Sequence, residues 1–242
     1  MSWLLDVGIE RPKTLSAKLA ETGESRTQKL HSNTVTFTLL EDRHPKQSSG
    51  VSLEWRERLS ASEEVPDFRA CTATQRNLLE DALTEAEKMA KRSQTTLSKT
   101  PARNRPNFQR YKEWFGNYTG QNYNKIKNNF NKIVTAIVDE TIIFNCSTEN
   151  CGSDSTFAYV YPTRPYEIFL CNAFWRAKLR GTDSRAGTII HELTHFNIVS
   201  GTDDITYGQS KCRELARTDP SEAIVNADNH EYFAENTPVL KV

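Results

Sequence analysis

The chain has 242 residues, enough for one large domain or for one domain with a modest appendage. Hydrophobic residues make up 37% of it and charged residues 26%, which is ordinary for a globular protein. Its 31 basic residues balance its 31 acidic ones, so no overall charge draws the protein to nucleic acid or to an anionic membrane. No apolar run is long enough to span a bilayer.

Residues 1–66 differ from the rest of the chain. Segments 34–39 and 51–55 have the composition of strands, and a loop-like segment separates them. We find no motif here, so a small β-rich appendage, a pro-segment and an export module all fit this region. The first 40 residues lack the apolar core of a signal peptide. Three explanations stay open. Either a leader has been removed, or the protein leaves its cell by a route that needs no leader, or it stays inside the cell.

Residues 67–242 predict one α+β domain. Apolar residues at spacings of three and four predict helices over 78–90, 111–118 and 123–138. Short apolar segments predict strands at 141–145, 157–161 and 167–170, the last two forming a hairpin. A further helix is expected after the candidate N-caps at 182–184, with Gly201 as its stop. The expected order is therefore helices first, then a small antiparallel sheet, then a helix that carries the motif described next.

That motif is the pentapeptide His191-Glu192-Leu193-Thr194-His195. Its two histidines are four residues apart, so both imidazoles project from one face of the helix and can bind one zinc ion. The intervening glutamate can reach a water molecule activated by the metal without binding the metal itself. It can then act as the general base and deliver the proton to the leaving amine. The motif predicts one Zn²⁺ and hydrolysis of peptide bonds, with Glu192 as the base.

A catalytic zinc ion usually has three protein ligands, and the residues alone leave the third one open. The metzincin spacing is excluded, because Ile198 and Gly201 stand where it requires glycine and histidine. Glu214, nineteen residues after His195, fits a thermolysin-like arrangement. Asp204 fits if the glycine-led turn at 201 folds back under the metal.

The sequence resembles a known family at this point. The motif followed by Gly-Thr-Asp-Asp-Ile-Thr-Tyr-Gly at 201–208 is similar to the aspzincins, the group of deuterolysin and the peptidyl-Lys metallopeptidases. Segments 156–162, 170–175 and 226–233 are similar to the lysine-specific branch. The resemblance extends from about residue 68 to the C-terminus and leaves out the first 66 residues. It implies a zincin-like catalytic domain.

The resemblance also implies roles for particular residues. Asp204 would be the third metal ligand beside His191 and His195, and Tyr207 would donate a hydrogen bond to the developing oxyanion. Asp228 and Glu231, three residues apart on one helix face, would form an acidic pocket for the ammonium group of a lysine, with Asp228 as its main partner and Glu231 in support.

The five cysteines are Cys71, Cys146, Cys151, Cys171 and Cys212. The resemblance implies disulfides between the first two and between the third and fourth. Cys212 is left over, and we expect it to be a buried free thiol. Disulfides suggest an oxidising destination, so we expect a protein that is secreted or delivered outside the producing cell, although this chain shows no signal peptide.

The leading functional hypothesis is a zinc-dependent endopeptidase that cleaves proteins or peptides on the N-terminal side of lysine. One alternative is an aspzincin protease with broader, deuterolysin-like specificity. Another is a secreted or injected toxin-type effector that uses this protease domain, or an interaction protein in which residues 1–66 do the work. Neither nucleic acid nor a membrane is an expected partner, and the sequence does not predict an oligomeric state.

Overall fold

The computed structural model describes residues 16–17, 26–30, 33–37 and 66–240, and the chain divides into two compact units, Met1–Glu57 and Arg58–Val242. The described part of the first unit is a sheet of order β1-β3-β2, in which β1 is parallel and β2 antiparallel to β3. Its strands are β1 (Ser16–Ala17), β2 (Arg26–Leu30) and β3 (Asn33–Phe37). β3 overlaps the strand predicted at 34–39. The strand predicted at 51–55 lies outside the described residues, and the predicted domain boundary at residue 66 stays a prediction.

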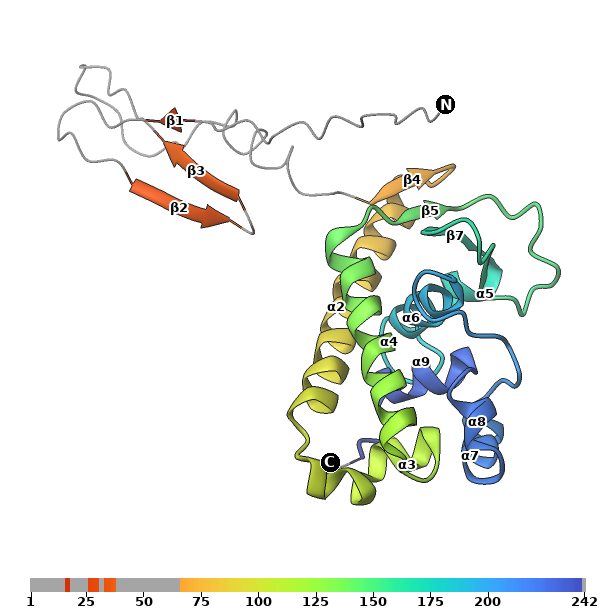
Figure 1. Cartoon of the computed structure of the whole chain (residues 1–242). Coiled ribbons are helices and arrows are strands. Elements are labelled where there is room, and N and C mark those ends of the chain that lie inside the picture. The colour runs from red at the N-terminus through yellow and green to blue at the C-terminus, as the bar shows by residue number, and fades with distance from the viewer. Residues whose placement is uncertain (1–15, 18–25, 31–32, 38–65, 241–242) are drawn as a thin grey trace, which may run out of the picture. The chain divides into compact units, whose positions relative to one another are not determined.

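The second unit is rich in helices, as predicted. Figure 1 shows α2 and α4 as two long helices side by side, with the sheet, α5 and α6 near their upper end and α3, α7 and α8 toward their lower end. The helices are α2 (Ala73–Lys99), the 3₁₀ helix η1 (Ala102–Asn107), α3 (Gln109–Phe115), α4 (Gly120–Asp139), α5 (Asn172–Arg176), α6 (Arg185–His195), α7 (Gln209–Thr218), α8 (Pro220–Ala223) and α9 (Ala227–Glu235). Within the described residues, none of them has the length and apolar character that crossing a bilayer requires.

Side-chain caps fix where these helices begin. Thr72 and Gln75 form a reciprocal capping box at the start of α2. Ser184 caps α6, because its hydroxyl oxygen accepts a hydrogen bond from the backbone N–H of Gly187 at 3.0 Å. The prediction that Gly201 ends this helix is wrong, since α6 already ends at His195. A turn follows, and Gly201, with φ +59°, closes it by donating its N–H to the carbonyl of Phe196.

The sheet of this unit is mixed, with the order β4-β5-β7-β6. Its strands are β4 (Asp67–Arg69), β5 (Ile143–Asn145), β6 (Ala158–Val160) and β7 (Glu167–Leu170). The predicted β6–β7 hairpin is confirmed, but the prediction of an antiparallel sheet is wrong for the other pairs, which are parallel. The cause lies in the connections: α2, α3 and α4 lie between β4 and β5, and a long crossover allows parallel pairing. β6 forms the edge of the sheet.

The cysteines pair as the resemblance implies. Disulfides join Cys71 to Cys146 and Cys151 to Cys171, and Cys212 on α7 is a buried free thiol. The first bridge ties the start of the domain to the end of β5, and the second ties the loop before β6 to the end of β7. Both bridges therefore hold segments of this sheet together.

The motif helix α6 lies in the core between α2 and α9. Side chains of α9 lie close to α6 at Gly187. A Cβ atom at this position would lie 2.3 Å from Glu235 Oε1 and 2.6 Å from Glu231 Oε1, so the two carboxylates of α9 occupy the space that any side chain would need. A side chain at position 187 would therefore have to displace these two carboxylates of α9.

We expect Gly187→Ala to lower the free energy of unfolding by about 1–3 kcal/mol, because the added methyl group overpacks this contact. Urea unfolding of the oxidised protein measures the effect. Gly120→Ala is the matched control, since a Cβ there meets only the Tyr118 hydroxyl at 3.8 Å. It should leave stability unchanged or raise it by less than about 1 kcal/mol. Equal effects of the two substitutions would contradict the close packing at Gly187.

Candidate metal centre

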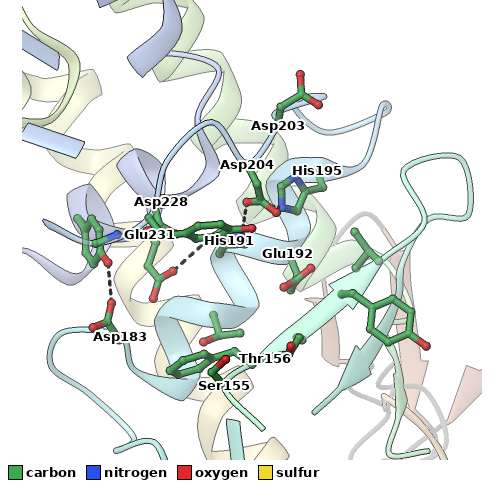
Figure 2. A pocket seen from close by; sticks show the side chains of 18 of the residues that line it. Ser155, Thr156, Asp183, His191, Glu192, His195, Asp203, Asp204, Asp228 and Glu231 are labelled. Carbon is green, nitrogen blue, oxygen red and sulfur yellow. Dashed lines mark hydrogen bonds and ion pairs between the residues drawn. The ribbon is translucent and has the colours of Figure 1, made fainter. Parts of the chain in front are cut away.

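Three side chains that the sequence proposes as metal ligands converge in the structure. Nε2 of His191 lies 3.1 Å from Oδ1 of Asp204, and Nε2 of His195 lies 3.4 Å from the same oxygen. The histidines come from α6 and the aspartate from the loop that follows it. Figure 2 shows Asp204 facing both rings. The turn that begins at Gly201 thus brings Asp204 back under α6. This is the placement that Asp204 needs in order to be the third ligand.

The other ring nitrogen of each imidazole, Nδ1, also lies close to an oxygen atom. His195 Nδ1 lies 2.9 Å from the carbonyl oxygen of Thr202. His191 Nδ1 lies 2.9 Å from Oδ1 of Asp228 and 3.3 Å from Oε2 of Glu231. When a metal ion is bound, an oxygen beside Nδ1 favours the tautomer that is protonated at Nδ1, which leaves the Nε2 lone pair of each ring for the metal. Both lone pairs then face Asp204.

This arrangement fits a zinc ion. Bonds of about 2.0–2.2 Å in a tetrahedral site place neighbouring ligand atoms roughly 3.3–3.6 Å apart. The two nitrogen-to-oxygen distances are close to that range, and the ligand atoms of His191, His195 and Asp204 all lie within 4.8 Å of one another. Two imidazoles and one carboxylate form a donor set that zinc prefers.

The other candidate third ligand, Glu214, does not join this cluster. It lies on α7 with 67% of its side chain exposed, and its carboxylate faces Arg217 at 3.9 Å. Of the two metal-binding groupings found in the described residues, neither includes it. The geometry therefore favours Asp204 over the thermolysin-like alternative.

A buried asparagine that the sequence analysis gave no role holds the Asp204 loop in place. The side-chain oxygen of Asn226 accepts hydrogen bonds from the backbone N–H groups of Ile205 and Thr206, and its amide donates to the Thr206 carbonyl. On either side of Asn226, the backbone pairs with Asp203 through two further hydrogen bonds. Asn226 belongs to the segment 226–233 that resembles the family. Its residue type alone does not predict that it holds the Asp204 loop.

Asp228 ties the same loop to His191. Its Oδ1 faces the imidazole, and its Oδ2 accepts a hydrogen bond from the backbone N–H of Gly208 at 2.8 Å. Asp228 is only 4% exposed. One buried carboxylate on α9 therefore positions both a metal-facing histidine and the end of the loop that carries Asp204 and Tyr207.

A cleft of about 710 Å³ opens beside these residues. All seven residues proposed from the sequence line it: His191, Glu192, His195, Asp204, Tyr207, Asp228 and Glu231. The edge strand β6 forms another wall. Figure 2 shows Glu192 on the side of the histidines away from Asp228 and Glu231, which gives the cleft a base at one end and an acidic recess at the other.

The carboxylates around His191 make the site favour positive charge. Burial opposes protonation of His191, but hydrogen bonds with Asp204, Asp228 and Glu231 raise its pKa well above the usual range. Burial also opposes ionisation of Asp204, yet the two histidines outweigh it and hold the pKa of Asp204 well below the usual range. The negative charge that these carboxylates bring to the site favours a bound cation.

Two other cleft residues have raised pKa values. Burial raises the pKa of the Glu192 carboxyl, and the neighbouring histidines offset part of that effect. Burial, followed by the Asp204 carboxylate, raises the pKa of the Tyr207 phenol, so its hydroxyl stays protonated at neutral pH. The Tyr207 ring lies parallel to the His191 ring, with centroids 6.4 Å apart and 59% of the residue exposed to the cleft and solvent.

Comparison with known proteins agrees with this geometry. The aspzincin family model, described as lysine-specific metallo-endopeptidase, matches residues 100–235. An extracellular protease of Aeromonas hydrophila is 43% identical over 236 residues, which cover 98% of this chain and 63% of that protein. The chain belongs to the aspzincin family. Membership confirms the predicted cofactor, a single Zn²⁺ ion.

Two further proteins are similar to this one over about seven tenths of the chain. A peptidyl-Lys metalloendopeptidase of Pleurotus ostreatus is 39% identical over 173 residues, covering 72% of this chain and 98% of that protein. The solved structure of a zinc peptidase from Grifola frondosa matches with a TM-score of 0.65 and 36% identity, over 71% of this chain and 100% of that one. The match confirms the predicted α+β zincin-like fold. The chain spans 63% of the Aeromonas protein and 46% of a peptidyl-Lys metalloendopeptidase from Armillaria mellea.

We expect Asp204→Ala to cost this aspzincin most of its bound zinc, because one of three converging ligand atoms is lost. Glu214→Ala is the matched control and should keep one zinc per chain. Metal analysis after dialysis measures both. Zinc loss in the Glu214 variant alone would support the thermolysin-like ligand set instead.

Asp228→Asn should weaken zinc affinity roughly 10- to 100-fold, the usual result when the partner of a metal-binding histidine is altered. Competition with a chromophoric chelator gives the affinity. Asp203→Asn is the control, since Asp203 lines the same cleft with an exposed side chain. If both variants bind zinc as tightly as the unaltered chain, Asp228 does not orient His191.

Proposed function

We propose that this chain is a zinc-dependent endopeptidase that hydrolyses peptide bonds on the N-terminal side of lysine. The observation that carries the proposal is that a single cleft contains both the groups for hydrolysis and an acidic recess for the lysine side chain. At one end lie a zinc-binding cluster of two histidines and an aspartate and the Glu192 carboxylate, and beside them lie the α9 carboxylates Asp228 and Glu231.

In the proposed reaction, Glu192 moves the protons. Zinc in this site supplies a Lewis acid that polarises the scissile carbonyl and lowers the pKa of water to about 7. Glu192 is 4% exposed and lines the cleft beside the two histidines, where it can reach a water molecule activated by the metal. It takes the proton as the water attacks and passes it to the leaving amine.

Tyr207 stabilises the charge that develops on the carbonyl oxygen. The loop held by Asn226 and Asp228 presents its ring beside His191, and the phenol remains a hydrogen-bond donor at neutral pH. A donor aimed at an oxyanion acts mainly in the transition state, so its effect falls on the rate constant rather than on substrate binding.

The acidic recess beside the zinc-binding cluster supports selectivity for lysine. Asp228 and Glu231 lie on one face of α9 and are 4% and 5% exposed. A compact ammonium on a flexible stem can enter such a recess, whereas the planar, wider guanidinium fits it poorly. The relatives from Pleurotus and Armillaria that carry the name peptidyl-Lys metalloendopeptidase point the same way.

We also propose that the enzyme acts outside the cell that makes it, on proteins or peptides. Two disulfides suit an oxidising compartment, and the Aeromonas relative is named an extracellular protease.

Glu192→Gln should keep zinc and fold but abolish turnover, because the nucleophilic water loses its base. Tyr207→Phe should lower kcat by roughly two to three orders of magnitude with little change in KM, the usual cost of an oxyanion donor. Peptide hydrolysis followed by chromatography measures both. Substantial turnover in the Glu192 variant would overturn the assignment of the base.

Digestion of a reduced, unfolded protein should yield fragments that begin with lysine. Mass spectrometry of the digest reports activity and preference together, and a parallel digest with chelator controls for the metal. Equal cleavage before lysine and arginine, or a preference for aliphatic residues, would favour the broader deuterolysin-like specificity. No cleavage by the zinc-loaded chain would overturn the proposed activity.

A further inference from the structure

A third acidic side chain, Asp183, lines the cleft near the proposed lysine recess. It is the residue before the Ser184 cap of α6, and it borders the same cleft as Glu231. Figure 2 shows it on the Glu231 side of the cleft, opposite Asp203 and Asp204. Asp183 is exposed, whereas Glu231 is buried. The two carboxylates therefore belong to the outer and inner parts of one recess.

The structure holds Asp183 rigidly toward this recess. The Tyr232 hydroxyl donates a hydrogen bond to Asp183 Oδ1 at 2.6 Å, and Tyr232 is 1% exposed with its ring against Trp114. The next residue, Ser184, donates both its backbone N–H and its hydroxyl to Glu235 Oε1, at 2.9 and 2.7 Å. Since Tyr232 and Glu235 both lie on α9, the helix that carries Glu231 also positions Asp183.

The acceptor count favours Asp183 as a binding group. An ammonium has three N–H donors. Asp228 Oδ2 accepts a hydrogen bond from the Gly208 N–H, and its Oδ1 lies 2.9 Å from Nδ1 of His191. Glu231 is 5% exposed and turns Oε2 toward His191, while its Oε1 accepts no hydrogen bond within residues 66–240. Asp183 Oδ2 likewise accepts no hydrogen bond among the described residues. Glu231 and Asp183 therefore each offer a cation an oxygen to which no described group donates.

No described lysine or arginine neutralises this group of acids. Asp183, Asp228, Glu231 and Glu235 form no ion pair with such a side chain anywhere in residues 66–240. Glu235 shows the effect of these neighbouring negative charges. Its pKa is raised to about 9, first by burial and then by the charge of Glu231. A ligand that brings one positive charge into the recess would relieve this repulsion.

We propose that Asp183 is a specificity-determining residue that binds the ammonium of the substrate lysine at the outer end of the recess formed by Asp228 and Glu231. This assignment rests on the proposed cleavage before lysine. It adds an exposed carboxylate, held by α9, to the two buried carboxylates that the same helix carries.

The test compares two peptides that are identical except for lysine or norleucine after the scissile bond. Asp183→Asn removes the charge but keeps an oxygen for Tyr232, and asparagine tolerates the φ of +53° at this position. The ratio of kcat/KM for lysine over norleucine should fall about tenfold through a higher KM, the cost of one charge-assisted hydrogen bond. Activity on the norleucine peptide and zinc content should not change.

Two further measurements sharpen the result. In the Glu192→Gln background, calorimetry should show the same roughly tenfold rise in Kd for the lysine peptide. Asp203→Asn, a change of the same kind on the opposite side of the cleft, should leave the ratio unaltered. Asp183→Gly also accepts the positive φ and supplies a second variant if the first folds poorly.

The outcomes separate the two proposals. An unaltered enzyme without preference for lysine over norleucine overturns the proposed specificity and this inference with it. A clear preference that Asp183→Asn and Asp183→Gly leave intact overturns the inference alone. Equal losses on both peptides would also overturn it, because they would show that Asp183 serves the structure of the cleft and not the charge of the substrate.

Discussion

Nδ1 of His191 and the backbone N–H of Gly208 meet the two oxygens of a single buried carboxylate, that of Asp228. A buried carboxylate is costly unless its oxygens are paired. The need to pair Asp228 therefore draws together three segments that are separate in sequence: the motif helix α6, the loop 201–208 and the start of α9. The metal-facing cluster is assembled where these three segments meet.

A polar network continues from this point into the core. Asn226 fixes the loop, and its amide also donates to Asn229, whose own amide donates to the carbonyl oxygens of Trp114 and Cys212. Both asparagines are fully buried. Because every member has a partner, the network adds rigidity instead of leaving unsatisfied groups in the core. The position of Asp204 thus depends on α3 and α7, which do not line the cluster themselves.

The sequence predicted the helices and the motif well, because each depends on a local pattern. The periodicity of α2 and α4, the Ser184 cap and the i, i+4 pair of histidines are all readable from neighbouring residues. The resemblance supplied the disulfide pairs and Asp204. Strand direction was predicted wrongly, because parallel pairing of β4, β5 and β7 depends on the course of long connections. The roles of Asn226, Gly187 and Asp183 depend on contacts between distant segments, which a single sequence does not encode in any local pattern.

β6 has a consequence for the form of the substrate. It is the outer strand of the sheet, it borders the cleft, and its far side carries backbone N–H and C=O groups that no other strand of the described sheet uses. An extended segment can add to such a strand and continue the ladder of backbone hydrogen bonds, whatever its side chains are. A helix or a folded strand offers no free backbone for this pairing. An enzyme of the proposed specificity would then recognise lysines in locally unfolded segments, so that the conformation of a target protein, as much as its sequence, would decide where it is cut.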